Sequence, residues 1–271
     1  MATKIWMGTT GAYGTGSNWV GGSGPSGGDD VRIPAGSGNI DGSDQSATAI
    51  GDFVVEDGYT GTIGSAGTAL KIDPDAFRFS GTGLAYLDLH SAAIVAEIFK
   101  TAAAAPGQRG LFIKGSALTA LNITGGSVGV ASRAGETATV TTIRVVGSTA
   151  DVWLGLGVSL TTLYVTAGKV DARCAATTVT IHGGEVTTSE EGAITTINCY
   201  GGTLYPQSTG TVTTLNAHGG FIDFTRSGAP RTVTTFKQNP GSTVKYDPSF
   251  ITFTNRSAPD LPIQLSSQTG F

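Results

Sequence analysis

A six-residue repeat, preceded each time by two threonines, recurs as Val179-Thr180-Ile181-His182-Gly183-Gly184, Ile197-Asn198-Cys199-Tyr200-Gly201-Gly202 and Leu215-Asn216-Ala217-His218-Gly219-Gly220. Looser copies extend the series, so that the leading apolar residues fall at positions 121, 143, 163, 179, 197, 215 and 236. These positions define six intervals over 115 residues, or about 19 residues each. A repeat of this length indicates a solenoid, in which equivalent segments stack on one another.

The pattern within the repeat predicts strands. Apolar and polar residues alternate with a period of two among β-branched threonines and valines, and glycine then turns the chain. A second apolar residue recurs beyond the turn, at Val128, Val170, Val186, Leu204, Ile222 and Val244. Each coil therefore holds at least two short strands, and each strand pairs with its equivalent about 4.8 Å along the axis. We predict an all-β fold, a right-handed parallel β-helix.

Alignment of the copies predicts which side chains stack in columns. An inward column contains Ile123, Val165, Ile181, Cys199 and Ala217, and an outward column contains Asn122, Tyr164, Thr180, Asn198 and Asn216. Like charges would repel within such a column, whereas threonine and asparagine can hydrogen-bond along it. This constraint accounts for a charged content of only 13%. Cys199 is expected to be a buried apolar residue, and the repeat gives no support for a disulfide to Cys174.

The chain is predicted to divide into three parts. Residues 1–46 are rich in glycine and lack the repeat, so they form an N-terminal cap or docking arm. Trp6 and Trp19 in this segment either cover the open end of the core or contact a partner. Residues 47–246 form the parallel β-helix.

Residues 247–271 form a C-terminal cap and tail, because Pro259 and Pro262 interrupt strand pairing. Within residues 91–105, Ser91 and a run of alanines from Ala102 are compatible with a short helix, but the β-branched and aromatic content of Ile94 to Phe99 favours a strand.

Composition argues against several partners. The formal net charge is −4 and no basic cluster is present, which disfavours nucleic acid. No apolar segment matches a signal peptide or a membrane span, so we expect synthesis in a cytoplasm and no membrane partner. No cofactor or metal is expected.

The acidic residues do not predict a catalytic site. Asp171 and Asp223 occupy the same place in coils three apart, which separates them by roughly 14 Å. Glycosidase carboxylate pairs lie roughly 5 to 9.5 Å apart. Glu185, Glu190 and Glu191 share one coil and are expected to form a solvated edge. No serine triad, phosphate loop or dinucleotide fingerprint is identifiable.

His182, Tyr200 and His218 share a column beside the glycine turns. The two histidines are two coils apart, about 10 Å, which is too far for a shared zinc ion with ligands about 2 Å away. We predict an aromatic ladder that packs beside the turn. A neighbouring subunit or a sugar would suit it as a partner.

The opening of the chain contains Trp6-Met7-Gly8, Asn18-Trp19, Pro25 and Asp29-Asp30-Val31-Arg32-Ile33-Pro34, and coils with paired threonines and glycines follow. With these features most of the chain resembles β-helical structural proteins of tailed bacteriophages, including those that decorate or cement the capsid. Bacterial autotransporter adhesins have similar features but carry export signals. The resemblance implies a homotrimer on the virion surface that binds the major capsid protein, made in the host cytoplasm without an export step. No catalytic residues carry over.

Three functions follow as hypotheses. The first is a non-enzymatic capsid decoration or cement protein that stabilises the shell. The second is a glycan-binding tail spike, fibre or adhesin, which is supported only by the column from His182 to His218. The third, a polysaccharide lyase or hydrolase, is disfavoured by the carboxylate spacing.

Overall fold

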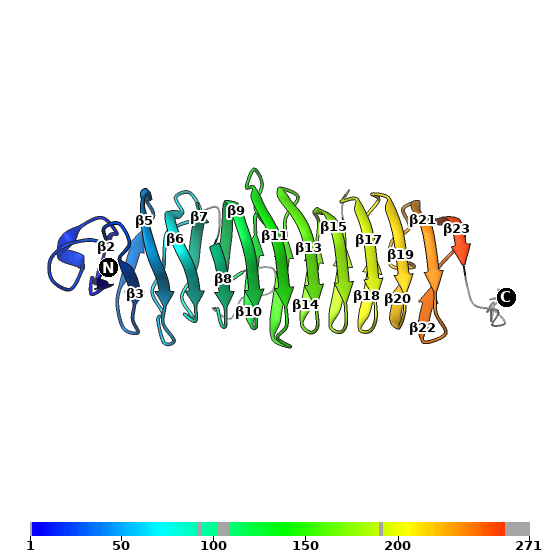
Figure 1. The fold of residues 1–271 in the computed structure, drawn as a ribbon, viewed down its shortest axis with the longest axis horizontal. Helices are drawn as coiled ribbons and strands as arrows, with labels where there is room; N and C mark the ends of the chain where they lie inside the picture. The colour runs from blue at the N-terminus through cyan, green and yellow to red at the C-terminus, as the bar shows by residue number, and fades with distance from the viewer. Residues whose placement is uncertain (1, 91–93, 102–108, 190–191, 258–271) are drawn as a thin grey trace.

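The protein is an elongated β-solenoid. In the computed structural model, which describes residues 2–90, 94–101, 109–189 and 192–257, about 11 coils stack along the long axis from the N-terminal end (Figure 1). Twenty-one strands belong to one continuous sheet in which every pairing is parallel, and β2 and β4 form a separate two-stranded sheet. The predicted all-β parallel solenoid is confirmed.

The strand bounds show short segments in the regular coils and longer, bent strands near the middle of the chain. The elements are β1 (Thr3–Ile5), β2 (Thr10–Ala12), the 3₁₀ turn η1 (Gly16–Asn18), β3 (Asp30–Ile33), β4 (Asn39–Asp41), β5 (Asp44–Val55), β6 (Leu70–Phe79), β7 (Ala85–Leu89), β8 (Ile94–Ile98), β9 (Leu111–Ile123), β10 (Gly126–Val130), β11 (Ala138–Val145), β12 (Ala150–Leu154), β13 (Val158–Val165), β14 (Lys169–Ala172), β15 (Ala175–Ile181), β16 (Glu185–Thr188), β17 (Ile194–Cys199), β18 (Thr203–Pro206), β19 (Val212–Ala217), β20 (Gly220–Asp223), β21 (Arg231–Gln238), β22 (Ser242–Lys245) and β23 (Ile251–Ser257).

The predicted columns are confirmed by the strand register. The inward column pairs residue by residue from one coil to the next and is at most 1% exposed, through Ile123, Val145, Val165, Ile181, Cys199 and Ala217. In the outward column, the Asn216 side-chain amide donates to Asn198 Oδ1 at 2.8 Å. Burial of the inward column and hydrogen bonding along the outward column both fix the register. A slip of one residue would turn the inward side chains outward and the outward side chains inward.

The paired threonines form a second corner in each regular coil. The sequence predicts a corner only at the glycines. In each regular coil the strand pairing skips the first threonine, as at Thr177 and Thr195. Both threonines of a pair face outward, whereas the residues on either side are buried. Two successive outward residues break the alternation of a flat strand, so each long strand bends into two segments.

The glycine corner requires glycine at its last position. Gly168, Gly184, Gly202 and Gly220 all have left-handed φ values, between +73° and +78°. At Gly202 an added Cβ would lie 2.6 Å from the carbonyl oxygen of Gly184 in the preceding coil. The corner therefore excludes side chains both by backbone conformation and by the close approach of the coil below.

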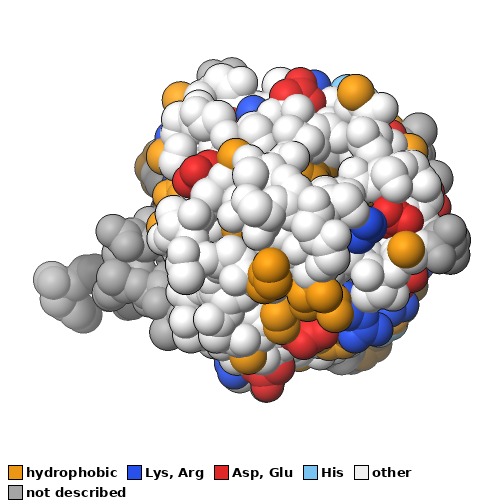
Figure 2. Space-filling view, turned by 90° about the vertical axis from the view of Figure 1, so that its left-hand side faces the viewer, with side chains coloured by type: hydrophobic (Ala, Val, Ile, Leu, Met, Phe, Trp, Pro, Cys, Tyr) orange, Lys and Arg blue, Asp and Glu red, His pale blue; other side chains and the backbone are white. Residues whose placement is uncertain are grey.

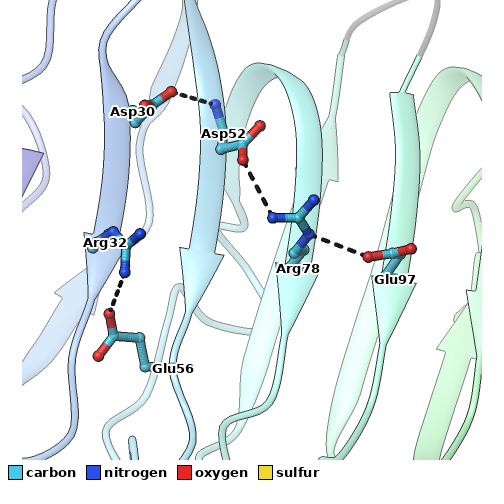
Figure 3. Close-up of polar contacts among 6 residues, drawn as sticks. All are labelled: Asp30, Arg32, Asp52, Glu56, Arg78 and Glu97. Atoms are coloured by element: carbon cyan, nitrogen blue, oxygen red, sulfur yellow. Dashed lines mark hydrogen bonds and ion pairs between the residues drawn. The ribbon is translucent and has the colours of Figure 1, made fainter. Parts of the chain in front are cut away.

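Charged residues of opposite sign pair between neighbouring coils in the N-terminal part, both directly in register, as Arg78 with Glu97, and diagonally, as Arg78 with Asp52. Arg78 on β6 lies between Asp52 on β5, at 3.4 Å, and Glu97 on β8, at 3.2 Å (Figure 3). Arg32 and Glu56 pair beside them at 3.2 Å (Figure 3). Exposed pairs of this kind contribute only about 0–1 kcal/mol each. Their contribution is to register, because opposite charges lie on neighbouring strands only in the observed pairing.

The coils extend beyond the predicted limits of 47 and 246. At the N-terminal end β1 pairs with β3, and β3 pairs with β5, so residues 1–46 supply strands of the first coils. At the other end β23 pairs with β21. The strand expected between Ile94 and Phe99 is confirmed by β8, whereas Ser91, Ala102, Pro259 and Pro262 lie outside the described residues.

Replacement of Gly202 tests the glycine corner. We expect Gly202→Ala to lower the free energy of unfolding by about 2 kcal/mol or more, because alanine must adopt a left-handed φ against the Gly184 carbonyl. The measurement is the urea unfolding midpoint followed by circular dichroism.

Gly67→Ala is the matched control, since Gly67 is exposed and an added Cβ meets no atom within 4 Å. Equal midpoints for the two variants would contradict the requirement for glycine at this corner.

Candidate functional site

In each coil, the residue that comes directly after the strand carrying the threonine pair, or after the equivalent strand of a coil that lacks the pair, begins the next corner. These residues form one column along the rod, which we call the corner column. Each member donates its backbone N–H, at 2.8 to 3.0 Å, to a backbone carbonyl in the preceding coil. The acceptor is the inward-facing residue at the end of the preceding coil's strand, as in the bond from Tyr200 to Ile181. The members are Glu56, Ser80, Phe99, Thr124, Val146, Thr166, His182, Tyr200, His218 and Asn239. The shared hydrogen bond aligns these side chains along one edge of the rod.

The predicted aromatic ladder is confirmed within the corner column. The rings of His182 and Tyr200 stack at 4.8 Å with a 9° interplanar angle, and those of Tyr200 and His218 stack at 4.6 Å and 7°. Tyr164 adds a tilted ring 5.1 Å from His182, although the alignment placed it in a different column. At the other end the side-chain amide nitrogen of Asn239 lies 3.1 Å from His218 Nδ1.

Stacking determines what the ladder can offer to a partner. The ring faces of Tyr200 are covered by His182 and His218, because the spacing between rings equals the coil spacing. Tyr200 is nevertheless 48% exposed, so its edge and hydroxyl face solvent. The ladder therefore presents hydrogen-bonding edges and no free face within its length on which a sugar ring could stack.

Exposed apolar side chains concentrate on the same column. Phe99, Val146 and Tyr200 are three of the nine large hydrophobic residues that are exposed in the described part of the chain. Isolated exposed apolar residues need no explanation, but an aligned strip of them indicates a contact surface. The corner column is therefore the strongest candidate for an interface along the rod.

Trp6 and Trp19 cap the core. Both side chains are 0% exposed, and their rings meet edge to face at 5.1 Å. The Trp6 indole N–H donates to the Gly38 carbonyl and the Trp19 indole N–H to the Tyr13 carbonyl. The partner-contact role predicted for these two tryptophans does not fit this burial, because neither indole reaches the surface.

The end face outside this cap is largely uncharged. Figure 2 views the rod from its N-terminal end and shows mostly uncharged side chains and backbone, with a small hydrophobic group among them. The exposed large hydrophobic residues of the first strand and its neighbours are Ile5, Met7 and Val20. These three side chains, and not the tryptophans, are available at this end.

The column of Asp171 does not supply a catalytic carboxylate pair. Thr187 and Tyr205 fill the coils that follow Asp171 in its column, as expected. Asp171 is engaged by Arg173, at 3.5 Å, and by the Ser189 hydroxyl, at 2.7 Å. Glu190 and Glu191 lie outside the described residues. Across the described ranges, no group of three or more histidine, cysteine or acidic residues is arranged to hold a metal ion.

The two cysteines are buried and form no disulfide. Burial raises the thiol pKa of Cys174 to about 12 and that of Cys199 to about 11. The thiolate is the reactive form, so both residues are inert at neutral pH.

Comparisons with protein-family models, with curated proteins and with solved structures found no match. Among the described residues, no helix has the length and apolar character needed to cross a membrane. Arguments about function therefore depend on the surfaces of this chain alone.

The hydrogen bonds of the Asp29 carboxylate make the stability of the N-terminal cap depend on pH. Its carboxylate accepts hydrogen bonds from the Ser26 hydroxyl at 2.8 Å, the Ala2 backbone N–H at 2.9 Å and the Ser26 backbone N–H at 3.1 Å. The Ser26 hydroxyl, followed by the Ala2 amide, lowers the pKa of Asp29 below its ordinary value. This stabilisation is complete above the unfolded-state pKa of about 3.9 and is lost as pH falls through the lower folded-state pKa.

We expect the hydrogen-exchange protection of the Ala2 and Ser26 amides, corrected for intrinsic exchange, to fall as pH is lowered through this range. Asp29→Asn should show less protection at neutral pH and little further loss on acidification. Asp41→Asn, at an exposed aspartate of β4, is the control and should behave like the wild type. The same pH-dependent loss in Asp29→Asn as in the wild type would rule out this carboxylate as the cause.

Proposed function

We propose that this protein is a non-enzymatic structural protein of a phage particle, a capsid decoration or cement protein that projects a stiff rod from the shell. The observation that carries the proposal is the corner column, in which the exposed Phe99, Val146 and Tyr200 and the stacked histidine rings lie along one edge of a β-solenoid, with threonines between them. Such a surface suits association with other chains. The lyase or hydrolase alternative is disfavoured by the spacing of Asp171 and Asp223, which at three coils apart, roughly 14 Å, is too long for a glycosidase carboxylate pair.

The partner that best fits the corner column is a second and third copy of this chain. In a parallel trimer, the same edge of each rod faces the common axis, and all three columns have the same spacing of about 4.8 Å. Phe99 and Val146 would then be covered by their equivalents. The edges of His182, Tyr200 and His218 would meet hydrogen-bonding edges of the neighbouring ladders.

The contact with the major capsid protein is assigned to the N-terminal end. That face is largely uncharged (Figure 2). Ile5, Met7 and Val20 are the exposed large hydrophobic residues described in the N-terminal segment. Synthesis in the host cytoplasm and assembly onto the capsid surface belong to the same proposal. The glycan-binding alternative gains no support from the ladder, because its stacked rings offer edges and not faces.

Incubation of purified protein with undecorated shells of the phage that encodes it tests this function, with cryo-electron microscopy as the readout. We expect rod-shaped density in groups of three on the shell surface, and a mass in solution three times the 27.4 kDa of one chain. Tyr200→Glu should give a single chain in solution, because the carboxylates of three chains would be brought together and desolvated in the trimer seam.

Val20→Glu is the matched variant at the end face: it should remain trimeric and bind the shells more weakly. Rods that bind only at the tail, or no binding with an intact trimer, would contradict decoration. A wild-type monomer would contradict the role of the corner column.

A further inference from the structure

A cleft of about 480 Å³ opens on the side of the rod, away from the corner column. One wall is an outward charged column in which Lys71, Asp88 and Lys114 pair in register on successive coils. The other wall is the loop of residues 132–137, between β10 and β11. The complete lining consists of Ala66, Lys71, Asp88, His90, Lys114, Gly115, Ser116, Arg133, Ala134, Gly135, Glu136 and Thr137.

The loop is fixed in place as a wall. Arg133 reaches back to donate a hydrogen bond to the backbone carbonyl of Ala66, which lies three coils nearer the N-terminus. Its backbone N–H donates to Glu136 Oε2 at 3.1 Å, and Gly135 turns the chain with a φ of +79°. The cleft is therefore preformed, and its size is within the range of about 300 to 1,000 Å³ that is typical of small-ligand sites.

The lining carries three cations and two carboxylates, a net charge of +1 with His90 neutral. Lys114 pairs with Asp88 at 3.5 Å, and Arg133 with Glu136 at 3.7 Å. The partner of Lys71 is Asp44, at 3.1 Å, whose side chain is 63% exposed and is not part of the lining. An exposed pair is held weakly, so Lys71 can turn toward an anion in the cleft at little cost.

The chemistry of the lining selects the ligand class. Only Ala66 and Ala134 contribute apolar side chains, so a hydrophobic ligand would leave many polar groups unpaired. A phosphate dianion would be repelled by the carboxylates of Asp88 and Glu136, whereas a sugar can place its hydroxyl groups on them. Phosphate is also favoured by converging free backbone N–H groups. The amides of Gly115, Arg133 and Glu136 instead donate to Thr137 O, Glu136 Oε2 and Arg133 O.

We propose that this cleft binds an acidic sugar, a uronic acid unit of a polysaccharide or a sugar of the same chemistry. The ammonium groups of Lys71 and Lys114 face the sugar carboxylate, with the Arg133 guanidinium on the opposite wall. The carboxylates of Asp88 and Glu136 accept hydrogen bonds from its hydroxyl groups, and the Ser116 hydroxyl can donate to them or accept from them. The site does not use the corner column, so it does not depend on the proposed role on a capsid.

Isothermal titration of the full chain with a short oligogalacturonate tests the proposal, with the neutral galactose oligomer of equal length as the comparison ligand. We expect binding of the acidic oligomer alone, weakened by added salt. Lys114→Gln should weaken binding about tenfold or more, because a cation is lost and Asp88 is left unpaired facing the ligand. Lys114→Arg should retain binding.

Lys169→Gln removes the same charge at an exposed residue outside the cleft and should leave the affinity unchanged. Melting temperatures of all variants, and amide shifts of Ser116 and Gly135 on titration, separate loss of the site from loss of the fold. Three results would each overturn the proposal: equal binding of the neutral oligomer, equal binding of a glutamate peptide that has the charge without the hydroxyls, or no binding by the wild type. Capsid binding is read out separately, so failure of either test leaves the other intact.

Discussion

Each side chain in the wall of this rod has its equivalent from the next coil directly above and below it, about 4.8 Å away. That spacing restricts which residues can share a column. Inside, small and branched apolar residues repeat, as at Ile181, Cys199 and Ala217. On the outside, equivalent side chains in a column must interact favourably with one another, because they are in direct contact. The solutions are hydrogen bonding between Asn198 and Asn216, ring stacking from His182 to His218, and pairing of opposite charges, as between Arg78 and Glu97.

The regular coils could be predicted from the sequence because the threonine and glycine pairs mark each copy, although the intervals between copies vary from 16 to 22 residues. The columns through residues 181, 199 and 217 and the aromatic ladder followed from that alignment. The charged columns could not be found in the same way, because the early coils differ in length and carry no common motif. Asp52, Arg78 and Glu97 are neighbours only once the register of β5, β6 and β8 is known.

Other features depend on contacts that no repeat encodes. The loop after β10 is an insertion into the repeat, and its attachment through Arg133 to Ala66 joins residues 67 positions apart. The cleft beneath it was therefore absent from the sequence analysis. Trp6 and Trp19 illustrate an ambiguity of composition, because tryptophan is favoured both in caps and at interfaces, and only their full burial separates the two. Tyr164 joins the ladder because its ring contacts His182, although its backbone belongs to another column.

The central claim is that equivalent residues of successive coils are direct neighbours, and a pair of engineered cysteines tests it most directly. Asn198 and Asn216 are paired across adjacent coils, within the Cα separation of roughly 4.4 to 6.8 Å that a disulfide needs. Thr180 and Asn216 are two coils apart, about 10 Å. On mild oxidation, Asn198→Cys with Asn216→Cys should form an intramolecular disulfide, detected by mass spectrometry, and Thr180→Cys with Asn216→Cys should not. Cross-linking of the second pair but not the first would contradict the stacked register.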